Sequence, residues 1–194
     1  MLVREVMTSP AVTVSEQTTV REALRLLDRF NITSLPVVDD SGAVRGVVSE
    51  ADLVRETLIP DPRAHMVPPE VAEDAPARVV ADVMTRHAIT VSEVADLAIA
   101  VDLLTSTSVK SVPVVRRGRV VGVLSRRDVV RVLARDDARI AAEVADLFHA
   151  DGMDWLADVD DGVVTVSGPS TDPEQRLARA LAGTVPGVVA VRVA

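Results

Sequence analysis

An internal repeat limits the possible folds of this chain more than any other feature. Val6-Met7-Thr8 recurs as Val83-Met84-Thr85, and Pro36-Val37-Val38 recurs as Pro113-Val114-Val115, each 77 residues later. Beyond the turn that follows, the spacing falls to 76 residues, so one residue is lost there. A turn between two strands is where a duplicated unit best tolerates a deletion. The sequence therefore predicts two copies of one small fold.

Each copy has the pattern of a short strand, a helix, two strands and a second helix. In the first copy, Val20, Leu24 and Leu27 share one helical face. Two apolar runs at 35–38 and 44–48, joined by a polar turn, predict a hairpin. The second copy repeats both features with Leu97, Val101 and Leu104 and with runs at 112–115 and 120–124. The closing helices are expected at about 50–58 and 126–135.

A proline-rich segment separates the copies. Residues 59–79 hold five prolines together with acidic residues, a composition that disfavours both helix and strand. We therefore expect repeat 1 at residues 1–58, a linker at 59–79, repeat 2 at 80–135 and a further domain at 136–194. His65 and Met66 lie in the linker, where we expect solvent exposure rather than ligand contact.

Beyond residue 135 a different pattern predicts a helix, a hairpin, a helix and a strand. The first helix, 136–148, has Ile140, Val144 and Leu147 on one face. The hairpin alternates through Trp155, Ala157 and Val159, turns at 160–162 and returns through 163–166. The second helix is expected to have Asp172 as its cap, Pro173 at its first position, and Leu177 and Leu181 facing inward. A final strand is expected at 188–193.

Each repeat also contains a strand that ends at a serine, followed by a helix with an aspartate three residues later. The two pairs are Ser49 with Asp52 and Ser125 with Asp128. A helix start attracts anions, and a nearby carboxylate accepts hydrogen bonds from a ribose diol, so the pattern fits a nucleotide site. The same spacing is a capping box, in which the two side chains satisfy their own helix. Two occurrences inside a longer repeat shift the balance towards a binding site, and both interpretations remain open.

Charge and composition exclude several classes of function. A net charge of −8 and a pI near 4.9 disfavour general nucleic-acid binding, which needs a basic surface. The chain has no cysteine, no apolar run long enough to span a membrane and no signal peptide pattern, so we expect a cytoplasmic protein. No base neighbours either serine, and His65, His87 and His149 are scattered, so we expect neither an enzyme nor a metal site.

The duplicated Met-Thr, Pro-Val-Val and Ser-x-x-Asp motifs resemble a tandem pair of CBS domains, a Bateman module, over residues 1–135. The segments 161–168 and 185–191 resemble parts of a BON domain. The resemblance implies an α/β fold of the α+β type. Two pseudo-symmetric βαββα CBS units pack together in it, and a small αββαβ BON domain follows.

The CBS resemblance implies a regulatory adenosine ligand (AMP, ADP, ATP or S-adenosylmethionine) in clefts between the two units, with no obligatory cofactor. Asp52 and Asp128 would hold ribose hydroxyls, and Ser49 and Ser125 would lie near ribose or phosphate. Val12 and Ile89, on the short strand after Met-Thr, would flank adenine, although plain core packing explains such apolar residues equally well. The remaining wall would comprise Leu35, Pro36, Lys110, Val112 and Pro113.

The two sites are not expected to be equivalent, because cations gather around the second junction. These are Lys110, Arg116, Arg117, Arg119, Arg126, Arg127 and Arg131. Charge-assisted hydrogen bonds to phosphate contribute about 1.5–3 kcal/mol each when shielded, so the Ser125 junction is predicted to bind phosphate more tightly. Arg116, Arg117 and Arg119 lie at a hairpin tip, and exposure to solvent alone is the alternative for them.

The resemblance also implies partners. A CBS pair implies a homodimer, with four CBS units in a disc, and a BON domain implies attachment to a phospholipid surface or to a protein. The helix 136–148 is acidic, which disfavours anionic membranes and favours a protein partner. The leading interpretation is a non-catalytic sensor whose ligand state is relayed by the C-terminal domain. The alternative is a ligand-free scaffold for dimerisation and interaction.

Overall fold

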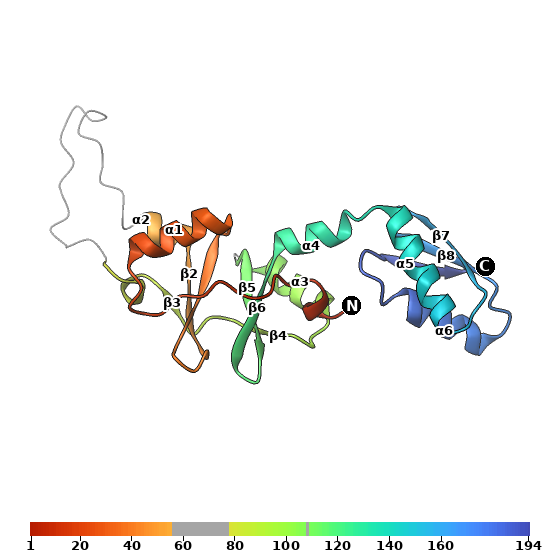
Figure 1. The fold of residues 1–194 in the computed structure, drawn as a ribbon, viewed down its shortest axis with the longest axis horizontal. Helices are drawn as coiled ribbons and strands as arrows, with labels where there is room; N and C mark the ends of the chain where they lie inside the picture. The colour runs from red at the N-terminus through yellow and green to blue at the C-terminus, as the bar shows by residue number, and fades with distance from the viewer. Residues whose placement is uncertain (56–77, 108) are drawn as a thin grey trace, which may run out of the picture. The chain divides into compact units, whose positions relative to one another are not determined.

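The computed structural model describes residues 1–55, 78–107 and 109–194, which form a mixed α/β structure (Figure 1). His65, Met66, nearly all of the predicted linker and the end of the first closing helix lie outside these residues. The chain divides into two compact units. Unit 1 comprises Met1–Met7, Glu93–Ser108 and Leu124–Ala194, and unit 2 comprises Thr8–Ser92 and Val109–Val123.

Unit 2 contains the predicted hairpin of repeat 1. Strands β1 (Ser34–Val38) and β2 (Val44–Ser49) pair antiparallel, and β3 (Thr85–Arg86) adds to β2. Helix α1 (Val20–Phe30) packs against α2 (Glu50–Arg55). The hairpin of repeat 2 is confirmed as β5 (Ser111–Arg116) and β6 (Arg119–Ser125), with β4 (Val91–Ser92) parallel to β5.

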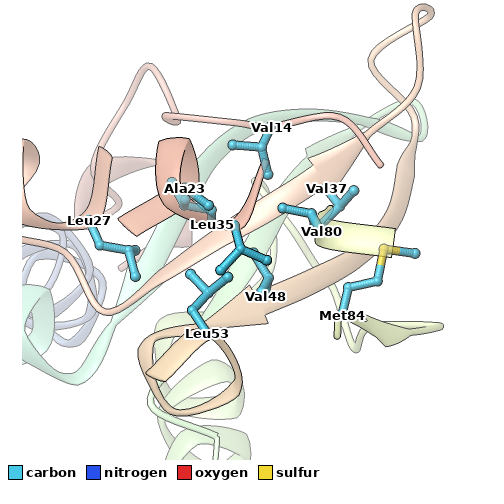
Figure 2. Close-up of a cluster of buried hydrophobic side chains, with 10 residues drawn as sticks. Val14, Ala23, Leu27, Leu35, Val37, Val48, Leu53, Val80 and Met84 are labelled. Carbon is cyan, nitrogen blue, oxygen red and sulfur yellow. The ribbon is translucent and has the colours of Figure 1, made fainter. Parts of the chain in front are cut away.

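The core of unit 2 draws side chains from both repeats. Figure 2 shows Val14, Ala23, Leu27, Leu35, Val37, Val48, Leu53, Val80 and Met84 in this cluster. On α1 the buried residues are Val20, Ala23 and Leu27, whereas Leu24 is half-buried against the cluster. The helical face predicted for α1 is therefore confirmed, with Ala23 at its centre. Val80 and Met84 belong to repeat 2 by sequence, so the start of that repeat completes the core of repeat 1.

This contribution reflects a reciprocal exchange between the repeats. Thr85 of repeat 2 pairs with Val47 on β2, and Thr8 of repeat 1 pairs with Val123 on β6. The short 3-10 helices η1 (Val3–Glu5) and η3 (Val80–Asp82) precede these segments. Gly46 permits the close approach of β3, because a Cβ there would lie 2.4 Å from the Thr85 carbonyl oxygen. The start of each repeat thus packs on the other.

The short strand on which Val12 and Ile89 were expected lies later in the chain than these two residues. In repeat 1 it is a single bridge, in which the Val14 amide donates to the Pro36 carbonyl at 3.0 Å. In repeat 2 it is the two-residue β4. Val12 and Ile89 precede these pairings, so their placement on the strand was wrong.

Unit 1 contains α3 (Leu97–Ser106), α4 (Arg126–Leu133) and the C-terminal fold. This fold comprises α5 (Asp137–Ala150), β7 (Leu156–Asp160), β8 (Val163–Ser167), α6 (Asp172–Ala182) and β9 (Ala190–Val193). Strand β8 is central, antiparallel to β7 and parallel to β9. The predicted αββαβ order is confirmed. No helix in the described parts of the chain has the length and apolar character needed to cross a membrane.

Two details of the C-terminal fold differ from the sequence prediction. On α5 the buried face is Ile140, Val144 and Phe148, and Leu147 is only half-buried. The Phe148 and Trp155 rings pack edge to face, with centroids 5.3 Å apart. Phe148 therefore takes the core position that was assigned to Leu147.

On α6 the cap is Thr171 rather than Asp172. The Thr171 hydroxyl accepts from the Glu174 amide, and the Glu174 carboxylate accepts from the Thr171 amide, which begins the helix one residue earlier. Ala178 and Ala182 are fully buried, whereas Leu177 is 42% exposed. Leu177 therefore does not face inward as predicted, while Leu181 is half-buried against the core.

Candidate functional site

The first Ser-x-x-Asp junction lies where β2 ends and α2 begins. Asp52 Oδ2 accepts from the Ser49 amide at 2.9 Å and from the Ser49 hydroxyl at 2.7 Å. The Asp52 amide lies 3.4 Å from the Ser49 Oγ. Asp52 is half-buried, and its Oδ1 accepts no hydrogen bond from any residue that the structure describes. One carboxylate oxygen thus holds the cap, and no residue in the described ranges occupies the other.

The second junction repeats this geometry at the start of α4. Asp128 Oδ2 accepts from the Ser125 amide at 2.8 Å and from its hydroxyl at 2.5 Å. Asp128 is only 3% exposed, and its Oδ1 lies 3.1 Å from Arg131 Nη1. The capping interpretation is therefore confirmed at both junctions. A carboxylate offers about four acceptor positions, so a cap occupies only part of its capacity.

Several polar side chains gather around the first junction. The Ser34 and Ser111 hydroxyls are 2.5 Å apart, and these serines occupy equivalent positions in the two repeats. Lys110 Nζ lies 3.0 Å from Glu50 Oε1, beside Ser49. Their side chains are 66% and 45% exposed, and an ion pair this exposed adds little stability. Lys110, which the sequence grouped with the second junction, thus contacts the first.

The arginines near the second junction are partly engaged elsewhere. The Arg126 guanidinium donates from Nε to the Leu104 carbonyl at 2.9 Å and from Nη2 to the Thr107 carbonyl at 3.1 Å. Arg127 is exposed. The hairpin-tip residues Arg116, Arg117 and Arg119 are also exposed. The tighter binding of phosphate at Ser125 stays a prediction, and Arg126, Arg127 and Arg131 are the arginines that follow this serine most closely in sequence.

The apolar wall residues divide by burial. Leu35 and Val112 are 0% and 1% exposed, and Pro36 and Pro113 are also buried. These four residues lie on β1 and β5 and are interior strand positions. Val12 is half-buried against the core of unit 2, whereas Ile89 is 49% exposed. Core packing therefore explains why residue 12 is apolar, but it does not explain an apolar side chain at residue 89.

Comparison with known proteins identifies the family. The family model described as CBS domain matches residues 3–58 and 80–135, more than half of the chain. The chain belongs to the CBS domain family. A CBS domain-containing protein of Dictyostelium discoideum is 29% identical over 140 residues, covering 70% of this chain and 92% of that protein. CBSX2 of Arabidopsis thaliana, named as chloroplastic, is 32% identical, covering 61% of this chain and only 56% of its own length.

Solved structures of CBS pairs share the fold. The crystal structure of CBSX2 in complex with AMP has a TM-score of 0.55 at 32% identity, covering 67% of this chain and 93% of that one. The CBS domain pair of protein MJ0100, in complex with 5′-methylthioadenosine and S-adenosyl-L-methionine, also gives 0.55 at 25% identity, covering 68% and 94%. The family match ends at residue 135 and leaves the C-terminal fold unassigned.

Sequence reasoning missed three contacts: the hydroxyl pair, the Lys110–Glu50 ion pair and the guanidinium contacts of Arg126. The hydroxyl pair did have a signal, because Ser34 and Ser111 stand 77 residues apart, at the spacing of the repeat. The other two contacts had no such signal in the sequence, because the repeat does not conserve their side chains. Thr33 stands where the first repeat would have the counterpart of Lys110, and Glu50 stands where it would have that of Arg126. Among the residues that the structure describes, no group of acidic or histidine side chains is arranged to hold a metal ion.

Proposed function

We propose that this CBS pair is a non-catalytic regulator that binds adenosine ligands at the Ser49–Asp52 and Ser125–Asp128 junctions. The observation that carries the proposal is the duplicated serine–carboxylate pair, in which Asp52 keeps one oxygen available beside its cap. Relatives with AMP, S-adenosylmethionine and methylthioadenosine bound support the ligand class. The ligands of those proteins share an adenosyl group, and AMP is the first choice for a test.

The chemistry of the junctions suits the two polar parts of a nucleotide. A ribose diol donates to a carboxylate, and Asp52 Oδ1 accepts such bonds without losing the cap. At the second junction the ribose replaces Arg131 on Asp128 Oδ1, at little cost because the Arg131 side chain is 65% exposed. The released guanidinium then lies close to the phosphate. Adenine would lie against Val12 and Ile89, and Lys110 would supply a cation at the first junction.

The C-terminal fold is proposed to be a BON domain that relays the ligand state to a protein partner. Its αββαβ order and the resemblance of segments 161–168 and 185–191 support this assignment. A ligand shifts a conformational equilibrium only when it binds the two states with different affinities. A cytoplasmic location stays a prediction. The alternative function is a ligand-free scaffold, which the exposed apolar side chains on α3 and α4 favour.

Thermal unfolding with AMP, ADP, ATP and S-adenosylmethionine separates the regulator from the scaffold. A ligand at about a hundred times its Kd is expected to add about 2.7 kcal/mol to the free energy of unfolding. The midpoint then rises with the logarithm of ligand concentration. Guanosine monophosphate is the control for a general phosphate effect. If none of the adenosine compounds moves the midpoint, the scaffold is the correct function.

We also propose that the chain forms a homodimer through α3 and α4. Helix α3 carries one charged residue in ten, whereas its counterpart α1 carries five in eleven. Ile99 on α3 is 71% exposed, and Val130 and Leu133 on α4 are 62% and 59% exposed. A helix that is apolar on all sides is usually buried. A second copy buries these side chains by presenting the same apolar surface.

Ile99→Glu is expected to convert the dimer to a monomer, because two copies would place like charges in one apolar contact. The measurement is molar mass by light scattering after size-exclusion chromatography. Leu156→Glu is the matched control, since Leu156 is 73% exposed but lies on β7 of the C-terminal fold. If the Ile99→Glu variant is still a dimer, the chains associate through another surface. If the wild type is a monomer, the proposed dimer does not exist.

A further inference from the structure

The connection between α4 and the C-terminal fold is short and closely packed. Only Ala134, Arg135 and Asp136 separate α4 from α5. The Arg135 amide donates to the Val132 carbonyl at 3.3 Å, and the Asp136 side chain caps α5 by accepting from the Ala138 amide at 2.8 Å. Both ends of the connection are therefore hydrogen-bonded to a helix, and only three residues link α4 to α5.

Arg135 adds side-chain contacts to this connection. Its Nη1 donates to the Pro186 carbonyl at 2.6 Å, and its Nη2 pairs with Glu143 Oε1 on α5. The Arg135 side chain is only 14% exposed, so water competes little for these bonds. The hydrogen bond from Arg135 is the main cause that holds the pKa of Glu143 below its usual value. The Arg135 contacts are defined here as those with Glu143 and Pro186.

The residues around Pro186 are shaped for this approach. Gly187 has a φ of +99°, and a Cβ there would lie 2.8 Å from Ile140 Cδ1 and 3.3 Å from Arg135 Cβ and Cδ. Ile140 and Val185 belong to the C-terminal core. The start of α5 is also fixed to the β7–β8 turn, because the Asp137 carboxylate accepts from the Asp161 and Gly162 amides at 2.8 and 2.9 Å. Arg135 therefore contacts α5 and the segment before β9, and α5 is in turn fixed to the β7–β8 turn.

We propose that Arg135 is the positioning residue that transmits ligand occupancy at the Ser125–Asp128 junction to the C-terminal fold. Helix α4 begins at that junction and ends at Leu133, two residues before Arg135. The inference rests on the proposed binding of an adenosine ligand, and it adds the residue through which binding acts. Coupling of this kind is reciprocal, so a change at Arg135 also alters ligand affinity.

The test is amide hydrogen exchange on the full-length chain, with and without saturating AMP, and in parallel with S-adenosylmethionine. In the wild type, ligand is expected to change exchange in 137–150 and 185–191 by about fivefold or more, at the low end of typical allosteric couplings. In Arg135→Ala the change falls below about twofold while the ligand still binds. The change in exchange in Arg135→Lys is expected to lie between those of the wild type and Arg135→Ala, because an ammonium lacks the planar guanidinium geometry that bridges two acceptors.

Arg139→Ala is the matched control. Arg139 also contacts Glu143, at 3.3 Å, but it lies on α5 and is 72% exposed, so its loss leaves the connection to α4 intact. Its ligand response is expected to equal that of the wild type. If circular dichroism shows that Arg135→Ala does not fold, Glu143→Gln is used in its place. Its change in exchange on ligand binding is expected to be smaller than that of the wild type.

Three outcomes would overturn the inference, and they are distinguishable. A full ligand response in Arg135→Ala, or in Glu143→Gln where that variant replaces it, shows that coupling takes another route. A wild type that binds AMP or S-adenosylmethionine without any change in the C-terminal fold shows that no coupling exists, while the proposed function stands. A wild type that binds neither compound removes the proposed function and this inference with it.

Discussion

Replacing both Asp52 and Asp128 by asparagine is expected to weaken AMP binding by about 10- to 150-fold at each junction. A hydrogen bond to a charged group contributes about 1.5–3 kcal/mol, and asparagine removes the charge that a ribose diol would meet. Asparagine keeps one carbonyl oxygen, so it still accepts from the amides of Ser49 and Ser125. The caps and the fold survive, and only the ligand is lost. Calorimetric titration of AMP into the double variant measures the effect.

Glu174→Gln gives the matched control for this pair of changes. Glu174 forms the same box with Thr171 on α6, outside the CBS pair, so its loss perturbs a cap without touching either junction. AMP affinity is expected to stay at the wild-type value. The single variants rank the junctions: the arginines near Ser125 predict that Asp128→Asn is the more harmful. A larger effect of Asp52→Asn would show that an available carboxylate oxygen matters more than nearby cations.

Phe148→Ala is expected to destabilise the C-terminal fold by about 3–5 kcal/mol, the usual cost of removing a buried aromatic ring. Phe148 is 0% exposed and packs edge to face on Trp155, so its loss removes both burial and a ring pair. Trp155 is the only tryptophan of the chain, which makes its fluorescence a selective reporter of this fold. Urea unfolding followed by that fluorescence gives the change in free energy.

Leu156→Ala is the control for Phe148→Ala, because Leu156 is adjacent to Trp155 in sequence but 73% exposed. A surface change of this kind is expected to stay within about 0.5 kcal/mol. If Phe148→Ala costs less than 1 kcal/mol, the ring is not central to the C-terminal core. The assignment of α5's buried face would then have to be revised.

The order of the main helices and hairpin strands was predictable because it depends on local patterns. Apolar runs such as 35–38 and 112–115 are short, bounded by turn residues and repeated, and both became strands of a hairpin. The sequence did not predict which residues of α6 face the core, nor the residue at which this helix begins. Its first turn is set by the reciprocal contacts of Thr171 and Glu174, and two alanines rather than Leu177 are buried in the C-terminal core.

The exchange between repeats was not predictable for a different reason. Thr8 and Thr85 end the same Val-Met-Thr triplet, so this motif does not tell whether each pairs with its own hairpin or with the other. The two Ser-x-x-Asp junctions show a third limit of prediction from sequence. The spacing of Ser49 and Asp52 is the same for a cap and for a ribose site, and the structure shows that the cap is formed. The proposed ligand would then bind through the remaining acceptor capacity of the carboxylate.

The most direct measurement of the central claim is calorimetric titration of AMP, and then of S-adenosylmethionine, into the wild-type chain. The duplicated junctions predict saturable binding of at least one of these compounds, with no more than two sites per chain and a dependence on Asp52 and Asp128. Absence of saturable heat for both compounds at millimolar concentration, from a folded and dimeric protein, would contradict the account and leave a scaffold with capped helices.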